Sequence, residues 1–142
     1  MVYSEDYKKL VDATALKDKY YEIDERVEEI CKEAFKGCDK LEEIVMPKKL
    51  KKIDSEAFQG CSSLTKLTLP DSVMSIGKGA FYKCSDLSKI TSLAEIPPMC
   101  GFKVFNGVNK TNCELIVPEG SVAAYTRAED WNKFSNIRGF SK

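Results

Sequence analysis

Residues 53–70 read IDSEAFQGCSSLTKLTLP, and two closely related segments stand 23 residues before and 23 residues after them. The earlier segment, residues 30–47, reads ICKEAFKGCDKLEEIVMP, and the later one, residues 76–93, reads IGKGAFYKCSDLSKITSL. All three share an initial isoleucine, an Ala-Phe pair, a cysteine and two later apolar positions. A constant period of this kind predicts a solenoid, in which each repeat buries its apolar side against its neighbours.

The second half of each repeat has the pattern of a β-strand. In residues 66–69, Lys-Leu-Thr-Leu, polar and apolar residues alternate, which places one row of side chains in the core and the other in solvent. Pro70 has no N–H to donate and therefore ends the strand. Stacked repeats thus predict a parallel sheet in which equivalent residues lie about 4.8 Å apart.

The first half of each repeat predicts a short helical turn. The Ala-Phe-x-x-Cys segment provides a small residue, a large one and a small apolar thiol within one turn. Gly37 and Gly60 stand directly before the cysteine and predict a left-handed backbone at the end of the turn. The third repeat has Lys83 at this position, so we expect its turn to be strained or differently shaped.

A further apolar column extends the repeats in both directions. At the same spacing of 23 residues it contains Val27, Leu50, Val73 and Ile96. We expect the side chains of this column to lie in the core.

The consensus V-x-x-I-x-x-x-A-F-x-x-C-x-x-L-x-x-I/L-x-M/L-P resembles the BspA-like leucine-rich repeat of bacterial surface proteins over residues 23–98. The segment from Cys113 to Pro118, followed by Tyr125, Trp131 and Phe134, resembles the usual C-terminal end of such proteins. The resemblance implies a right-handed leucine-rich-repeat solenoid. It also implies a bacterial surface or secreted location and a binding or adhesive role without catalysis.

Both ends should be capped, because an open solenoid leaves apolar side chains and unpaired strand edges in water. Leu10, Val11 and Leu16 have helix-like spacing after a possible N-cap at Ser4, which predicts an N-terminal helix over the first repeat. At the other end, residues 115–118 predict a last strand. A short helix from Ser121 through Tyr125 and an aromatic plug of Trp131, Phe134 and Ile137 then follow.

These assignments describe a single α/β solenoid domain spanning residues 1–142. Residues 1–22 form the N-terminal helical cap, residues 23–98 the three repeats of 23 residues, and residues 99–142 a degenerate last repeat with the C-terminal cap.

The composition restricts the possible functions. The chain has 22 Lys and Arg against 22 Asp and Glu, which argues against a nucleic-acid partner, and it has no histidine. The sequence therefore predicts no catalytic, cofactor-binding or metal-binding site. No segment approaches a membrane span and the start lacks the apolar core of a secretory signal, so the chain as written predicts a soluble protein of undecided compartment.

The six cysteines fall into two groups. Cys38, Cys61 and Cys84 occupy one column of the repeat, and we expect them to be free thiols in the core. The other three, Cys31, Cys100 and Cys113, lie outside that column. Their redox state is open, and a bridge between Cys100 and Cys113 is the alternative to free thiols.

Charges should alternate in sign between the first two repeats. The acidic residues Glu25, Glu28 and Glu29 fall in the same columns as Lys48, Lys51 and Lys52. We expect them to pair across one repeat, each pair contributing about 0–1 kcal/mol.

The candidate binding site is the outward face of the strands. It consists of two rows: Glu43, Lys66 and Lys89, and beside them Val45, Thr68 and Thr91. We expect this array to bind a protein or a surface glycan. Two alternatives stay open: a solvated face without a partner, and a structural or self-assembling unit whose oligomeric state the sequence leaves undetermined.

Overall fold

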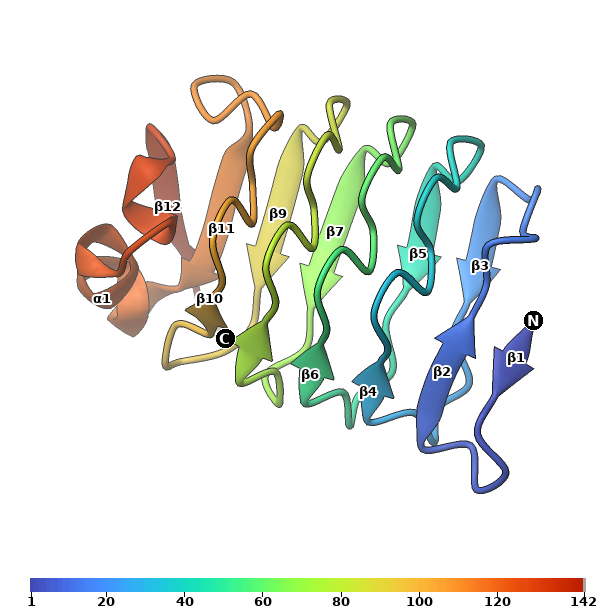
Figure 1. Ribbon diagram of the computed structural model, residues 1–142. Coiled ribbons are helices and arrows are strands. Elements are labelled where there is room, and N and C mark those ends of the chain that lie inside the picture. Colours follow the sequence, from blue (N-terminus) through green and yellow to red (C-terminus); the bar gives the residue numbers. More distant parts are fainter. Residues whose placement is uncertain (142) are drawn as a thin grey trace.

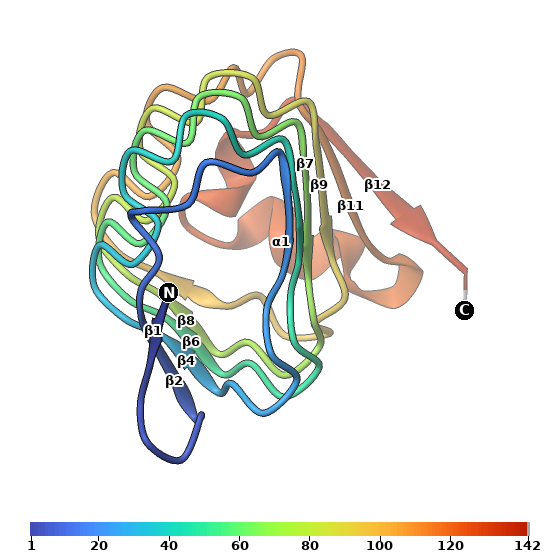
Figure 2. The same cartoon turned by 90° about the vertical axis from the view of Figure 1, so that its right-hand side faces the viewer.

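The computed structural model describes residues 1–141 and is a β-solenoid. Each turn of the solenoid, here called a rung, contributes one short strand to each of two faces (Figure 1). Viewed from the N-terminal end, successive rungs superpose closely (Figure 2).

The first face is a six-stranded sheet. Its strands, in spatial order, are β1 (Val2–Tyr3), β2 (Lys9–Asp12), β4 (Glu29–Ile30), β6 (Lys52–Ile53), β8 (Ser75–Ile76) and β10 (Met99–Cys100). All neighbours are parallel except β1 and β2, which are antiparallel.

The second face consists of two sheets. A two-stranded sheet contains β3 (Tyr20–Glu22) and β5 (Glu43–Val45), and a four-stranded sheet contains β7 (Lys66–Leu69), β9 (Lys89–Ser92), β11 (Glu114–Pro118) and β12 (Asn136–Phe140). All of these pairs are parallel. Between β5 and β7 a backbone bond joins the Thr65 N–H to the Glu42 carbonyl at 3.3 Å, although the two strands belong to different sheets.

The predicted register is confirmed in the central rungs. Ile53 lies opposite Ile76 and Leu67 opposite Ile90, in each case 23 residues apart. The fourth rung is longer by one residue, because Met99 lies opposite Ser75, a spacing of 99 − 75 = 24.

This extra residue makes the sequence prediction for Ile96 wrong. Val27, Leu50 and Val73 are buried, whereas the Ile96 side chain is 82% exposed. Since Leu67 and Ile90 keep the regular spacing and Ser75 and Met99 do not, the insertion lies in the loop before β10. Ile96 is displaced from its column by that loop.

The corners of the rungs are turns rather than α-helices. The Ala34 N–H donates to the Cys31 carbonyl, and the Cys38 N–H donates to the Phe35 carbonyl, the i→i−3 pattern of 3₁₀ geometry. Among residues 1–141 the only α-helix is α1 (Val122–Arg127), beside the 3₁₀ segments η1 (Glu119–Ser121) and η2 (Trp131–Lys133). The predicted α/β class is therefore not confirmed, and the fold is a β-solenoid.

The corners are joined by hydrogen bonds and by a column of aromatic rings. The Phe35 N–H donates to the Ala57 carbonyl at 2.7 Å, and the Phe58 N–H donates to the Ala80 carbonyl at 2.8 Å. The rings of Phe35 and Phe58 are stacked with centroids 4.8 Å apart, and the column continues through Phe81 to Phe105. All of these rings are buried, so they form the centre of the core.

A left-handed residue ends each corner. Gly37 and Gly60 have φ angles of 76° and 77°, and Lys83 keeps the same conformation with a φ of 62°. Of the two sequence expectations for Lys83, the strained turn is therefore the correct one. A second left-handed column, which sequence reasoning missed, contains Glu33 and Glu56 with φ angles of 60° and 58°.

The N-terminal segment contradicts the predicted helical cap. Residues 1–22 form the strands β1, β2 and β3, and β2 and β3 pair with β4 and β5 as an additional rung. Only Leu10 is buried in β2, and the Ala13 N–H donates to the Ala34 carbonyl at 2.6 Å. The helix-like spacing was misleading because pairing with the open edges of the first full rung determines the conformation.

The C-terminal segment agrees with the predicted plug at Trp131 and Phe134, whereas Ile137 is only partly buried and lies in β12, a strand that the sequence analysis did not predict. Trp131, Phe134 and Tyr125 are buried, and α1 begins after Ser121. The Trp131 Nε1–H donates to the Pro98 carbonyl at 2.9 Å, and the Tyr125 hydroxyl donates to the Ala94 carbonyl at 2.6 Å. These bonds attach the plug to the fourth rung.

All six cysteines are free thiols, so the alternative of a bridge between Cys100 and Cys113 is contradicted. The predicted core column is confirmed: the Cys61 thiol donates to the Phe35 carbonyl at 3.2 Å, and the Cys84 thiol donates to the Phe58 carbonyl at 3.1 Å. Burial raises the pKa of Cys84 to about 12, so this thiol is protonated at neutral pH.

Replacing Lys83 by glycine should stabilise the protein. A left-handed backbone costs an L-residue about 1–2 kcal/mol, and the greater freedom of glycine in the unfolded chain offsets part of the gain. We expect Lys83→Gly to raise the free energy of unfolding by about 0.5–1 kcal/mol in urea titrations. Lys78→Gly is the matched control, because Lys78 is exposed but has no positive φ. It should destabilise, and a loss of stability in Lys83→Gly would contradict the strain assigned to this residue.

Candidate functional site

The six residues of the predicted binding face lie on three consecutive rungs. Lys66 lies opposite Lys89 and Thr68 opposite Thr91 in the β7–β9 ladder, while Glu43 and Val45 are on the neighbouring strand β5. All six point away from the core, because the residues between them are buried. These buried residues are Ile44, Leu67 and Ile90. We call this array the strand face.

The same two rows continue onto two further strands, β3 and β11, whose residues the predicted face did not include. On one side Tyr20 lies opposite Glu43, and on the other Glu114 lies opposite Lys89. The first was missed because residues 1–22 were assigned to a helix. The second strand was predicted over residues 115–118, but Glu114 was left out of the face because its spacing from Lys89 is 114 − 89 = 25 residues and not 23. A test for a changed period after residue 93 would have found it.

The middle of the strand face carries two adjacent positive charges. Equivalent residues of neighbouring parallel strands lie about 4.8 Å apart in backbone position, so Lys66 and Lys89 are close neighbours. Within residues 1–141 neither lysine forms an ion pair. The nearest acidic residue along the row beyond Lys89 is Glu114, and its carboxylate accepts from Arg138 Nε at 2.6 Å. This hydrogen bond lowers the pKa of Glu114, which stays ionised and bound to Arg138.

A cavity of about 330 Å³ opens on the strand face at the break between the two sheets. Four residues of the predicted site line it, namely Glu43, Val45, Lys66 and Thr68. Its other lining residues are Ile44, Met46, Lys48, Pro70 and Leu93. The cavity therefore combines charged groups with an apolar wall.

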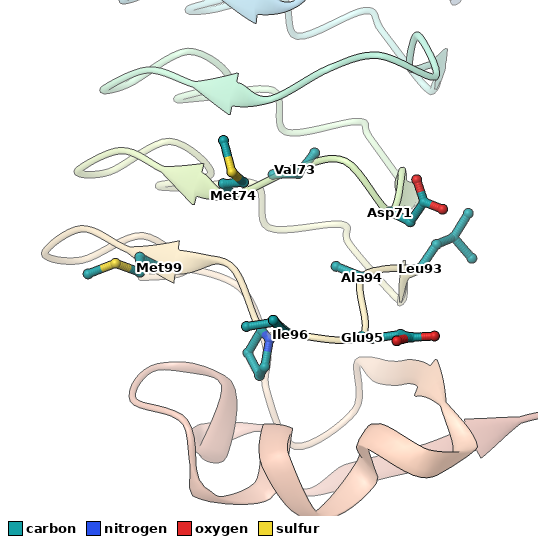
Figure 3. A pocket seen from close by; sticks show the side chains of 9 residues that line it. Asp71, Val73, Met74, Leu93, Ala94, Glu95, Ile96 and Met99 are labelled. Carbon is teal, nitrogen blue, oxygen red and sulfur yellow. The ribbon is translucent and has the colours of Figure 1, made fainter.

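A second cavity, of about 490 Å³, lies at the adjoining edge of the solenoid (Figure 3). Its lining residues are Asp71, Val73, Met74, Leu93, Ala94, Glu95, Ile96, Pro97 and Met99. Met74 and Met99 come from consecutive rungs, and Ile96 comes from the loop before β10 (Figure 3). Leu93 lines both cavities.

The charge pairing predicted between the first rungs is confirmed in part. Lys51 Nζ lies 3.3 Å from Glu28 Oε1, and Glu29 is opposite Lys52 in the ladder. No ion pair joins Glu25 to Lys48 within residues 1–141. The charge pairing does not extend to the third rung, where Met74 and Ser75 stand in the columns of Lys51 and Lys52.

No group of three or more His, Cys, Asp or Glu side chains could hold a metal ion in the part of the chain that the structure describes. The most shifted carboxylate is Asp24, whose pKa falls to about 2 because the Arg26 side chain donates hydrogen bonds to it. No helix within residues 1–141 is both long enough and apolar enough to cross a membrane.

Comparison with known proteins places the repeats in a known family. A family model described as "BspA type Leucine rich repeat region" matches residues 14–116 in six copies. The solved structure of the pneumococcal vaccine antigen PcpA is similar in fold, with a TM-score of 0.58 and 17% sequence identity. The similarity covers 99% of this chain and 45% of the antigen chain, so this chain spans less than half of that structure. No curated protein matched.

Two variants can compare how much an exposed ion pair and a buried core residue contribute to the free energy of unfolding. Lys51→Ala removes an exposed ion pair and should lower the free energy of unfolding by about 0–1 kcal/mol. Leu67→Ala leaves a cavity in the core and should lower it by about 2–5 kcal/mol. Urea unfolding of both variants checks this order. A larger loss for Lys51→Ala than for Leu67→Ala would show that charge pairing, rather than apolar burial, stabilises the rungs.

Proposed function

Because the chain belongs to the BspA-type leucine-rich repeat family, we propose that it is a non-catalytic module that binds a protein partner through the strand face. The observation that carries this proposal is the adjacent pair Lys66 and Lys89: neither forms an ion pair within residues 1–141, and Lys66 lines a cavity. Like charges directly opposite each other destabilise a ladder, and the neighbouring carboxylates of Glu43 and Glu114 form no ion pair with either lysine within residues 1–141. An acidic group of a partner would offset this repulsion.

The surroundings of the two lysines suit a peptide-like partner. Thr68 and Thr91 provide hydroxyl groups that can donate and accept hydrogen bonds, and Val45, which is 41% exposed, provides apolar contact area. The strands are parallel and regularly spaced, so an extended segment of a partner meets the same kind of side chain at each rung. A carboxylated glycan is the other ligand class that could use these lysines.

We place the module at a bacterial surface or in a secreted protein. This rests on the family and on the similarity in fold to a pneumococcal vaccine antigen. A non-catalytic role is supported by membership of the repeat family.

The test is a double charge reversal, Lys66→Glu with Lys89→Glu. Random peptides displayed on phage are selected on the immobilised wild-type protein, and the affinities of the selected peptides are measured by fluorescence anisotropy. We expect acidic peptides to be selected and the double variant to bind them at least tenfold more weakly, because each charge-assisted hydrogen bond contributes about 1.5–3 kcal/mol. The control, Lys32→Glu with Lys40→Glu, reverses two exposed lysines outside the strand face and should change affinity less than twofold.

Equal effects of the two double variants would indicate non-specific attraction and contradict the proposal. Failure to select any peptide would contradict it as well. Binding to a glycan array that depends on Lys66 and Lys89 would assign the strand face to a glycan instead.

Self-assembly is a second candidate function, and one observation favours it. The strands β3 and β12 end the second face, and within residues 1–141 each pairs on one side only. Such edges can pair with another chain. If two copies join in this way, the sedimentation coefficient should rise with concentration, and Ile137→Pro in β12 should abolish the rise. A constant monomer value would contradict self-assembly.

A further inference from the structure

Three large apolar side chains are exposed around the second cavity. Met74, Ile96 and Met99 are 66%, 82% and 79% exposed, and all three line this cavity (Figure 3). We call these three residues the apolar corner. The floor of the cavity is also apolar, because it contains the buried residues Val73 and Ala94. An exposed apolar surface of this kind is typical of an interaction site.

The two methionines of the apolar corner stand in columns where earlier rungs carry charged residues. The first two rungs have Glu28 and Lys51 in the column where the third has Met74. Similarly, Lys52 lies opposite Ser75, and Ser75 lies opposite Met99 in the fourth rung. Since charged residues fit these columns, stability of the fold does not require methionine in them.

The apolar corner is joined to the strand face by Leu93. This residue follows β9, is half-buried and lines both cavities. Lys66 stands in the cavity on one side of Leu93, and Met74 stands in the cavity on the other side. A ligand that fills both cavities therefore meets positive charge at one end and an apolar surface at the other.

We propose that the two cavities form one groove that binds an extended segment of a partner protein, with acidic residues at Lys66 and Lys89 and apolar residues in the apolar corner. The charges select this occupant: Lys48 and Lys66 line the first cavity against the single carboxylate of Glu43 and attract acidic groups there. The second cavity is lined by the carboxylates of Asp71 and Glu95, which disfavour acidic groups. The inference rests on the proposed function, because it extends the strand face and names the sequence class of its partner.

The test compares variants of the two ends of the groove. Met74→Lys with Met99→Lys gives the apolar corner the lysines that the second rung carries at Lys51 and Lys52, so the fold should tolerate it. The control is Val2→Lys with Val11→Lys, which changes two exposed apolar residues far from the groove in sequence. Each protein is titrated with the acidic peptides selected on the wild type. The titrations are repeated with peptide versions whose apolar residues are changed to serine.

We expect the selected peptides to carry apolar residues at one end and the variant of the apolar corner to bind them at least tenfold more weakly. For the serine versions of the peptides, the variant of the apolar corner and the wild type should bind with equal affinity, because the apolar contact is already absent. The control should bind within twofold of the wild type. Circular dichroism and urea unfolding check that each variant is folded.

The other outcomes separate the two proposals. If only Lys66→Glu with Lys89→Glu weakens binding, the proposed function stands and the continuous groove is overturned. If only the variant of the apolar corner weakens binding, both the strand face and the continuous groove are overturned. Sedimentation that shows a dimer, dissociated by Met74→Lys with Met99→Lys, would assign the apolar corner to a second copy and overturn the inference.

Discussion

The structure depends on hydrogen bonds and ring stacking between equivalent residues of neighbouring rungs. Each corner donates the N–H of its phenylalanine to a backbone carbonyl of the next rung, and the rings of Phe35, Phe58 and Phe81 form one stacked column. One rung alone could make none of these contacts. Stability is therefore close to a sum over neighbouring pairs of rungs, and the ends need special residues.

Stacking in register also makes departures from the repeat informative. Lys83 keeps a left-handed backbone that glycine adopts at lower cost, because the rungs on both sides impose the same turn. Ile96 is exposed because one extra residue in the fourth rung displaces it from the core column. The adjacent lysines of the strand face and the methionines of the apolar corner are departures of the same kind, in charge and in polarity.

The sequence predicted the parts of the fold in which one pattern repeats. Spacing alone identified the buried columns of Phe58 and Cys61, the register of the central strands and the outward position of the strand face. The prediction failed where an inserted residue changes the spacing, or where pairing with a distant segment determines the local conformation. Residues 1–22 form strands instead of the predicted helix because they pair with β4 and β5. Glu114, which lies opposite Lys89, was left out of the predicted face because the spacing changes after Lys89. The position of Leu93 in the lining of both cavities depends on side-chain conformation, which no period encodes.

Residue-by-residue amide hydrogen exchange tests the stacking of rungs most directly. If bonds between rungs hold the solenoid, the amides of Phe35, Phe58 and Phe81 should be among the most protected and should exchange only through global unfolding. Amides of the β1–β2 hairpin at the N-terminal end should exchange faster. Rapid exchange at the three phenylalanines, or a continuous helical block of protection over residues 4–16, would contradict the account.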